Sequence, residues 1–314
     1  MVPVAVQVPL ALAWSVGAQY VLETRKRLRL RRAFAAYLSP QMADQISESD
    51  FDLSLGGKVV DATILFTDIE GFTAICESME PGPVSHMLTT YFNLTSKPIF
   101  DRNGTIIKFI GDAILAVWGA PIEDPHQAEN AVRAALAIVQ AAGQPITGHN
   151  LRTRIGINSG RTLAGNLGSD ARFDYTIIGD ATNYASRLEG FNKYFQTEIL
   201  ISDATCGQLS DQIKVRRLGR FLIPGKSKPV GIHEVLGLTS SFADGGGWVT
   251  EFENALACFS RREFDQAETL FRHVIHMRGG SDGPSEFYLG QIAEARKASG
   301  PQDSWDGVVK IATK

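Results

Sequence analysis

The sequence predicts an α+β fold in which a mixed sheet is flanked by helices. Strand-like runs alternate with helical runs from about residue 59 to residue 238, a pattern that by itself also suits a parallel sheet. Two of the strand-like runs, Thr105 to Ile110 and Ala113 to Trp118, are separated only by Gly111-Asp112. A turn this short joins antiparallel strands. The predicted hairpin therefore favours α+β over a doubly wound parallel sheet.

Length and composition limit the kinds of protein to consider. The chain has 314 residues, of which 44% are hydrophobic, enough for about two folding units with a real core. Its 3 cysteines are not spaced as a pair, which is typical of reduced thiols in a cytosolic protein. The net charge of -3 argues against a general nucleic-acid binder, because such proteins carry a broad basic face.

Charge is unevenly distributed at the N-terminus. Residues 1–22 contain no Asp, Glu, Lys or Arg, whereas residues 25–32 read RKRLRLRR. As a helix, the run from Val4 to Leu22 would be roughly 29 Å long, about the thickness of the bilayer hydrocarbon. Basic residues that follow an apolar run indicate an anchor whose C-terminal side is cytoplasmic, not a signal peptide. We therefore expect the protein at the cell membrane, with a helix lying on the membrane surface as the alternative.

This prediction divides the chain into four parts. Residues 1–23 form the anchor, and residues 24–58 form a basic stop followed by linker helices. Residues 59–238 form the α+β domain, and residues 239–314 form a Gly-rich linker with a helical extension. The extension has the spacing of tetratricopeptide-like hairpins but holds too few to form a solenoid, so we expect it to pack on the rest.

Two short motifs each place an aspartate at the end of a strand. In LFTDIEGFT the strand ends at Asp68, and Gly71 permits a sharp entry into a helix. The first N–H groups of that helix, at Phe72 and Thr73, would face a bound phosphate. In KFIGDAILA, Asp112 occupies the hairpin turn. Two carboxylates beside a helix N-terminus predict a site for Mg²⁺ and a polyphosphate, the alternative being that both merely cap turns.

Four motifs in order resemble the catalytic domain of the class III adenylate and guanylate cyclases, in their bacterial membrane-anchored form. They are FTDIEGFT, KFIGDAILAVWG, RIGINSGRTLAGNLG and DYTIIGDATNYASRLEG. The resemblance implies a ferredoxin-like domain that works as a head-to-tail homodimer with its active sites at the interface. It further implies conversion of ATP to 3′,5′-cyclic AMP and pyrophosphate in intracellular signalling. Two Mg²⁺ or Mn²⁺ ions per site would assist in-line attack of the ribose 3′-hydroxyl on the α-phosphate.

The same resemblance assigns roles to residues on the two halves of such a site. Asp68 and Asp112, with the carbonyl of Ile69, match the metal ligands. Asn183 and Arg187 match a transition-state pair supplied by the partner protomer, and their i, i+4 spacing places both on one face of a helix. The resemblance also suggests a further partner of the protein, either an upstream sensor or a protein that binds the helical extension.

Phosphate and base contacts follow from the remaining matches. Arg161 matches a phosphate-contacting arginine, and Lys226 a triphosphate lysine, with Lys228 able to substitute for it. Lys108 and Thr176 match the pair that reads adenine, where guanylate-specific relatives have Glu and Cys. The sequence thus predicts an adenylate cyclase. The alternatives are a guanylate cyclase and a catalytically silent cyclase-like module that senses nucleotide or mediates dimerisation.

Overall fold

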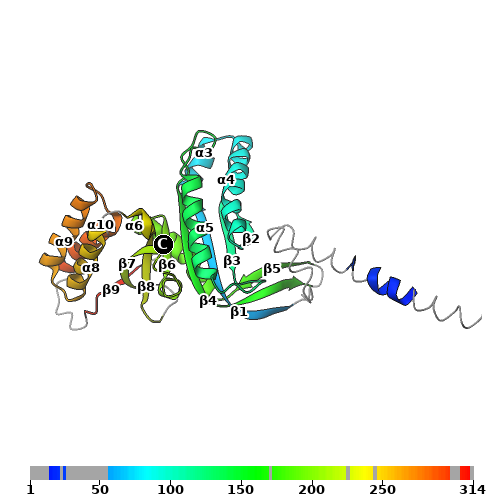
Figure 1. Cartoon of the computed structure of the whole chain (residues 1–314). Helices are drawn as coiled ribbons and strands as arrows, with labels where there is room; N and C mark the ends of the chain where they lie inside the picture. Colours follow the sequence, from blue (N-terminus) through cyan, green and yellow to red (C-terminus); the bar gives the residue numbers. More distant parts are fainter. Residues whose placement is uncertain are drawn as a thin grey trace, which may run out of the picture.

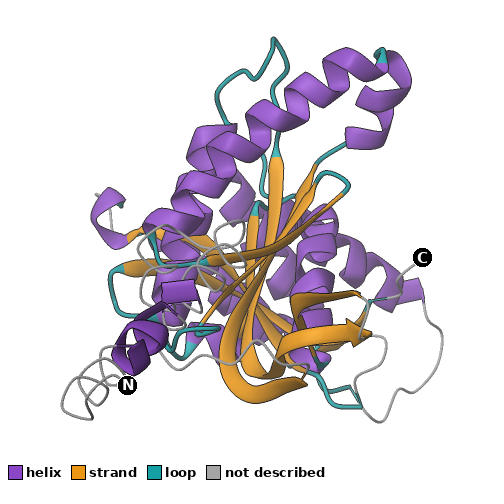
Figure 2. Ribbon diagram, turned by 90° about the vertical axis from the view of Figure 1, so that its right-hand side faces the viewer, coloured by secondary structure: helices purple, strands orange, loops and turns teal. Residues whose placement is uncertain are grey.

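One sheet of nine strands runs through the part of the chain that the computed structural model describes, residues 14–21, 24–25, 56–169, 172–223, 227–242, 246–297 and 305–311. The strands are β1 (Gly56–Ile69), β2 (Thr105–Ile110), β3 (Ala113–Trp118), β4 (Thr153–Ser169), β5 (Arg172–Ile178), β6 (Ile199–Ser202), β7 (Ile213–Leu222), β8 (Val230–Leu238) and β9 (Val308–Lys310). Their order is β2-β3-β1-β4-β6-β8-β7-β9, with β5 paired to β4 outside this row. Helices pack around the twisted sheet (Figure 1, Figure 2).

The sheet is mixed, as the sequence predicts. β1 pairs antiparallel with both β3 and β4, whereas β4 and β6 run parallel. β2 and β3 form the predicted antiparallel hairpin around Gly111-Asp112. Gly111 has a φ of 64°, a left-handed conformation that glycine adopts without steric cost. The α+β class is therefore confirmed.

The helices cover both faces of the sheet. They are α3 (Phe72–Ser78), α4 (Pro81–Asp101), α5 (Gln127–Ala142), α6 (Asp180–Phe195), α7 (Asp203–Cys206), α8 (Gly247–Ser260), α9 (Phe264–Met277) and α10 (Gly283–Lys297). Successive residues of β1 point to opposite faces. Ile64 belongs to a core cluster with Ala185 of α6, and Leu65 to another with Ile99 of α4 and Ile138 of α5. Thus α6 lies on one face of β1, and α4 and α5 lie on the other.

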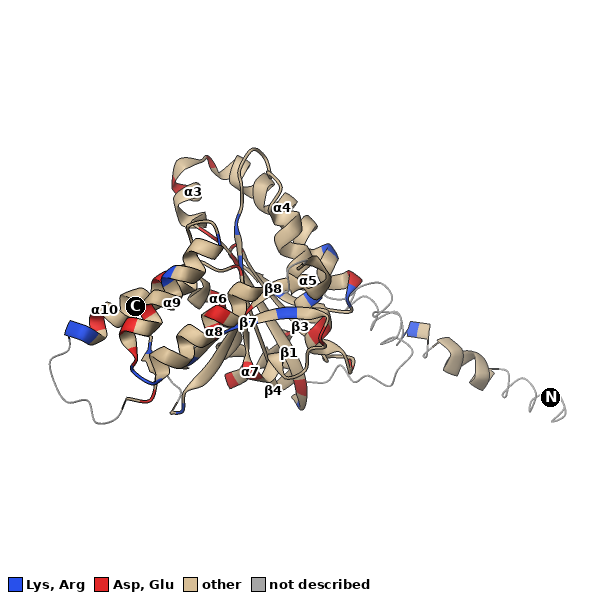
Figure 3. Ribbon diagram, turned by 60° about the vertical axis from the view of Figure 1, so that its left-hand side comes forward, with Lys and Arg blue, Asp and Glu red and all other residues tan. Residues whose placement is uncertain are grey.

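Helices α8 to α10 pack at the β7 end of the sheet and against α6 (Figure 1). Their aromatic side chains share one buried cluster with those of α6 and β7. β9 then runs parallel to β7, with Val308 opposite Arg220. Basic positions are interspersed with acidic ones along these helices (Figure 3). For example, Arg296 of α10 pairs with Asp265 and Glu268 of α9.

The expected membrane location was wrong. Among the described residues no helix combines the length and the apolar character needed to cross a bilayer. The rest of the run from Val4 to Leu22, and most of the predicted linker before residue 56, lie outside the described residues.

Candidate active site

Two aspartates meet where β1 ends and the β2–β3 hairpin turns. Phe66 of β1 lies opposite Leu115 of β3, and continuing this register brings Asp68 beside the turn that carries Asp112. The backbone N–H of Ile69 donates a hydrogen bond to Oδ2 of Asp112 at 3.0 Å. This bond holds the Asp112 carboxylate against the end of β1. The structure thus brings together the residues predicted to bind metal.

The electrostatics of this pair suit a cation. Burial, and after it the charge of Asp112, raise the pKa of Asp68 to about 6. Two carboxylates and a nearby backbone carbonyl are hard oxygen donors of the kind that Mg²⁺ and Mn²⁺ prefer. In the described part of the chain no group of three or more His, Cys, Asp or Glu side chains is placed to hold an ion. Two carboxylates fit Mg²⁺ in donor chemistry, because Mg²⁺ usually takes one or two carboxylates together with phosphate oxygens and water.

Arg154 is a buried cation beside the aspartates that sequence reasoning missed. It lies directly opposite Asp68 in the register of β4 on β1, and its Nη2 is 3.6 Å from Oδ2 of Asp68. The side chain is 13% exposed, and its Nε has no hydrogen-bond partner among the described residues. Leaving a buried donor unpaired costs about 1–3 kcal/mol, which a phosphate oxygen would relieve. Arg154 is therefore placed to bind an anion next to the Asp68–Asp112 pair.

Glu189 of α6 faces Arg154 from the other side. Its Oε1 lies 4.0 Å from Nε of Arg154. Burial, and after it the charge of Asp68, raise the pKa of Glu189 to about 7, although Arg154 opposes the shift. The spacing of the sequence does not reveal this contact, because it depends on how closely α6 approaches β4.

One glycine and two asparagines fix how closely α6 approaches β4. A Cβ at Gly156 of β4 would collide with the backbone of α6 at Ala185 and Glu189, so only glycine permits this distance. Asn158 donates from Nδ2 to the carbonyl of Ala181 at 2.9 Å. Asn192 donates likewise to the carbonyl of Ile155, also at 2.9 Å. These contacts hold Glu189 over the aspartates.

Replacing Glu189 with Gln should stabilise the nucleotide-free protein above pH 7 by about 2–3 kcal/mol. The pKa of Glu189 in the folded protein, about 7, lies above its ordinary value of 4.5, so the folded state holds this proton more tightly than the unfolded state. The resulting stability is complete below pH 4.5 and is lost as the pH rises through 7. Gln carries no such proton. Urea unfolding should therefore give the wild type and Glu189→Gln the same free energy of unfolding near pH 4, and a higher value for Glu189→Gln at pH 8. A gap that does not change with pH would contradict this assignment.

Asn183 and Arg187 lie on α6 but turn away from the aspartates of their own chain. Asn183 is exposed and Arg187 is half-buried. Arg187 and Glu189 are two positions apart, a rotation of about 200° around a helix. Because Glu189 points toward Arg154, the Asn183–Arg187 face points the other way. One chain therefore presents the two predicted halves of the site in different directions.

The predicted base-reading residues come from neighbouring strands. Lys108 is exposed on β2, directly after a register irregularity at which Ile107 is buried. Thr176 is half-buried on β5, opposite Gly165 of β4. β2 and β5 are in contact although they do not pair. The structure therefore places the strands of Lys108 and Thr176 side by side.

The predicted phosphate contacts are more dispersed. Arg161 is exposed on β4, seven residues and roughly 23 Å of strand beyond Arg154. There it lines a cavity of about 390 Å³ with Asp180 and Asp203, so the structure does not bring it to the Asp68 pair of its own chain. Lys226 lies outside the described residues, and Lys228 is exposed.

The helix that follows Asp68 begins as predicted. Gly71 has a φ of 73°, and α3 starts at Phe72 without a side-chain cap. Phe72 packs on the cluster that includes Ile69, whereas Thr73 is exposed. The start of α3 therefore lies close to the Asp68–Asp112 pair.

Fold and motifs place this chain among the nucleotide cyclases. Residues 57–235 match the family model described as adenylate and guanylate cyclase catalytic domain, and the chain belongs to this family. The match confirms the family predicted from the sequence. "Adenylate cyclase 1" of Rhizobium meliloti (strain 1021) is 38% identical over 218 residues, 65% of this chain and 32% of that protein. "Adenylate cyclase" of Anabaena cylindrica is 34% identical over 186 residues, 55% of this chain and 36% of that protein.

Solved structures agree on the fold. The adenylyl cyclase CyaB from P. aeruginosa has 36% identity and a TM-score of 0.52, covering 58% of this chain and 96% of that one. The guanylyl cyclase Cya2 has 32% identity and a TM-score of 0.53, covering 60% and 98%. The cyclase-domain fold is thereby confirmed. The chain spans about a third of the length of the two curated relatives above.

Proposed function

We propose that this chain is an adenylate cyclase that converts ATP to 3′,5′-cyclic AMP and pyrophosphate. The observation that carries the proposal is the Asp68–Asp112 pair with Arg154 opposite, a place for a metal–polyphosphate complex. Both aspartates and the Asn183–Arg187 pair are present, whereas a silent cyclase-like module is expected to have lost some of them.

Asp68, Asp112 and the carbonyl of Ile69 would hold two Mg²⁺ or Mn²⁺ ions. When bound, these ions supply charge that lowers the pKa of the ribose 3′-hydroxyl and neutralises the triphosphate. Arg154 would donate to a phosphate oxygen from its unpaired Nε, with Glu189 orienting the guanidinium. Backbone N–H groups at Phe72 and Thr73 would contact the same phosphates.

A second copy of the chain would complete the site. Asn183 and Arg187 face away from the aspartates of their own chain, which suits a homodimer in which each protomer supplies one half of each site. Asn183 would orient the ribose, and Arg187 would neutralise charge that develops on the α-phosphate. Lys226 and Arg161 are proposed as further triphosphate contacts from this half.

Lys108 and Thr176 are proposed to select adenine. The ammonium of Lys108 would donate to a ring nitrogen, and the hydroxyl of Thr176 would accept from the exocyclic amine. Guanine presents a carbonyl where adenine presents that amine, so the pair should discriminate against GTP. The relatives include cyclases of both names, so the choice of base needs a direct assay.

Purified protein should therefore cyclise ATP faster than GTP in the presence of Mn²⁺. Changing Lys108→Glu together with Thr176→Cys should shift the ATP-to-GTP turnover ratio toward GTP by at least about 100-fold. Lys297→Ala, a change at an exposed lysine of α10, serves as the control and should leave the ratio unchanged.

Three outcomes of this assay would decide against the proposal. ATP turnover that survives the double change would remove Lys108 and Thr176 from base recognition. GTP preference in the unchanged protein would favour a guanylate cyclase. No product from either nucleotide, together with nucleotide-dependent dimerisation, would favour a silent sensor module.

A further inference from the structure

Helices α8 to α10 bury the side of α6 that neighbours its Asn183–Arg187 face. One core cluster joins α6 to these helices and to β7. From α6 it takes Tyr184, Leu188, Phe191 and Phe195, and from α8 to α10 it takes Phe252, Phe259, Phe271 and Tyr288. Phe191 is one helical turn beyond Arg187, so the surface that these helices cover adjoins the one that carries Arg187.

Contact is tightest where α6 ends and α10 begins. The ring of Phe195, the last residue of α6, lies 4.8 Å from the ring of Phe287 and 5.3 Å from that of Phe221. A Cβ at Gly283, the first residue of α10, would collide with the carbonyl oxygen of Phe195. Backbone therefore meets backbone at this point, and a displacement of α10 cannot be absorbed by a flexible side chain.

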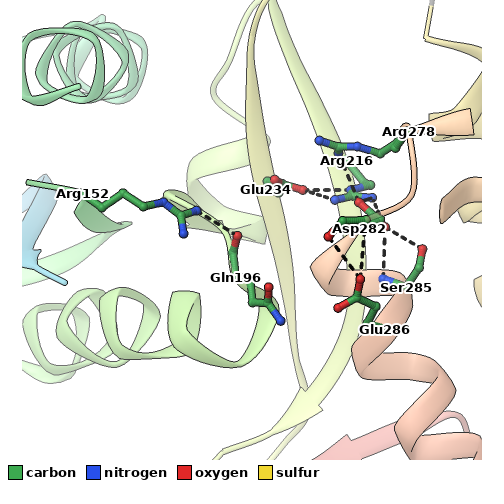
Figure 4. A network of polar contacts seen from close by, with 9 residues as sticks. Arg152, Gln196, Arg216, Glu234, Arg278, Asp282, Ser285 and Glu286 are labelled. Carbon is green, nitrogen blue, oxygen red and sulfur yellow. Dashed lines mark hydrogen bonds and ion pairs between the residues drawn. The ribbon is translucent and has the colours of Figure 1, made fainter. Parts of the chain in front are cut away.

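The first turn of α10 is itself fixed to the sheet. Asp282 accepts hydrogen bonds from the backbone N–H of Ser285 at 3.1 Å and from its hydroxyl at 2.6 Å. The same carboxylate accepts from Nη1 of Arg216 on β7 at 2.9 Å, and Arg216 also donates from Nε to Glu234 on β8 at 2.9 Å (Figure 4). Arg216 is fully buried. The fixed first turn of α10 therefore limits the positions that the C-terminal end of α6 can take.

We infer that helices α8 to α10 position α6, and through it Asn183 and Arg187, for the partner's metal-binding half. The inference rests on the proposed function. Asp68, Asp112 and Ile69 are held by strand pairing and by the Ile69–Asp112 bond. α6 is held toward β4 by Gly156, Asn158 and Asn192, whereas its end at Phe195 is bounded by Gly283 and Phe287 of α10. Gly283 and Phe287 are therefore positioning residues for the partner's site.

Gly283→Ala tests the inference. The added methyl pushes α10 away from the end of α6, and a misplacement near 1 Å costs up to about 100-fold in rate. We expect kcat to fall by about 10-fold or more, with the KM for ATP changed less than about twofold, because Arg187 acts mainly in the transition state. Gly290→Ala, on the same helix where a Cβ meets nothing within 4 Å, should keep full activity.

Mixing two variants distinguishes a displaced α6 from a general loss of structure in the Gly283→Ala chain. In a mixed dimer with Asp68→Ala, the Gly283→Ala chain supplies an intact Asp68–Asp112 pair. The Asp68→Ala chain supplies an intact α6, so each mixed dimer has one intact site. Activity should return to the level of the control mixture of Asp68→Ala with Arg187→Ala. Paired with Arg187→Ala, Gly283→Ala should give no recovery and fall to about half the Gly283→Ala level, because neither mixed site then has an intact α6 half.

Several results would overturn the inference. One such result is a wild-type kcat in folded Gly283→Ala. Another is that the mixture of Gly283→Ala with Asp68→Ala fails to recover activity while the control mixture recovers it. Failure of the control mixture would instead remove the shared site, and with it the proposed function. If Gly283→Ala does not fold, Phe287→Leu replaces it, since this change removes the ring contact with Phe195 while keeping an apolar side chain. The same pattern of mixing is expected, and its absence would count against the inference.

Discussion

Asp68→Ala should reduce the proposed cyclase activity by about 1,000-fold or more, because the proposed metal site would lose one of its two carboxylates. Asp68 is the side chain on which burial, Asp112 and Arg154 all act, so its loss also leaves Arg154 without its carboxylate partner. The readout is the amount of cyclic AMP formed per mole of protein with ATP and Mn²⁺. Asp101→Ala, at an exposed carboxylate at the end of α4, is the matched control and should keep full activity.

Mixing Asp68→Ala with Arg187→Ala should restore about a quarter of wild-type activity. Under random association about half of the dimers are mixed, and each mixed dimer has one intact site of two. Arg187→Ala alone should be as inactive as Asp68→Ala, because each removes one half of every site. If the mixture stays inactive although both variants dimerise, the site does not lie between protomers.

Arg216→Ala should destabilise the protein by about 3–5 kcal/mol, the largest stability loss that we expect from a single change. Arg216 is fully buried between two carboxylates, and its guanidinium lies 4.5 Å from the ring of Phe252 and 4.9 Å from that of Trp248. Removing it takes the paired cation from Glu234 and leaves Asp282 with Arg278 alone, whose Nη1 lies 3.2 Å from Oδ1 of Asp282. Urea unfolding at pH 7 measures the change.

Arg296→Ala is the matched control for Arg216. Arg296 also contacts two carboxylates, Asp265 and Glu268, but its side chain is 42% exposed. Exposed pairs contribute about 0–1 kcal/mol, so this variant should stay close to wild type. Equal losses for the two variants would show that burial does not decide the strength of the Arg216 network.

The parts of the fold and of the site that could be predicted are those set by residues close together in the sequence. The hairpin around Gly111-Asp112 could be predicted because its length admits only one pairing. The Asp68–Asp112 pair followed from two motifs at strand ends. Arg154 could not be found this way, since its place opposite Asp68 depends on the register between β1 and β4, whose strands are about a hundred residues apart.

Long-range packing accounts for most of the other differences. Glu189 reaches Arg154 only because Gly156 lets α6 approach β4, and no local pattern indicates that distance. The apolar run before Leu22 suggested a membrane helix from composition alone, but among the described residues no helix is long and apolar enough to cross a bilayer. The shared core of α6 with α8 to α10 likewise appears only once the chain is folded.

The short strand β9 has a consequence for aggregation. β7 has ten residues, and β9 pairs with three of them, from Arg220 to Leu222, along its outer edge. Trp305 secures the approach to β9, donating from Nε1 to the carbonyl of Phe259 at 3.0 Å. An uncovered strand edge is a template on which other chains can add. β9 thus covers the β7 edge from Arg220 to Leu222, where a strand of another chain could otherwise add.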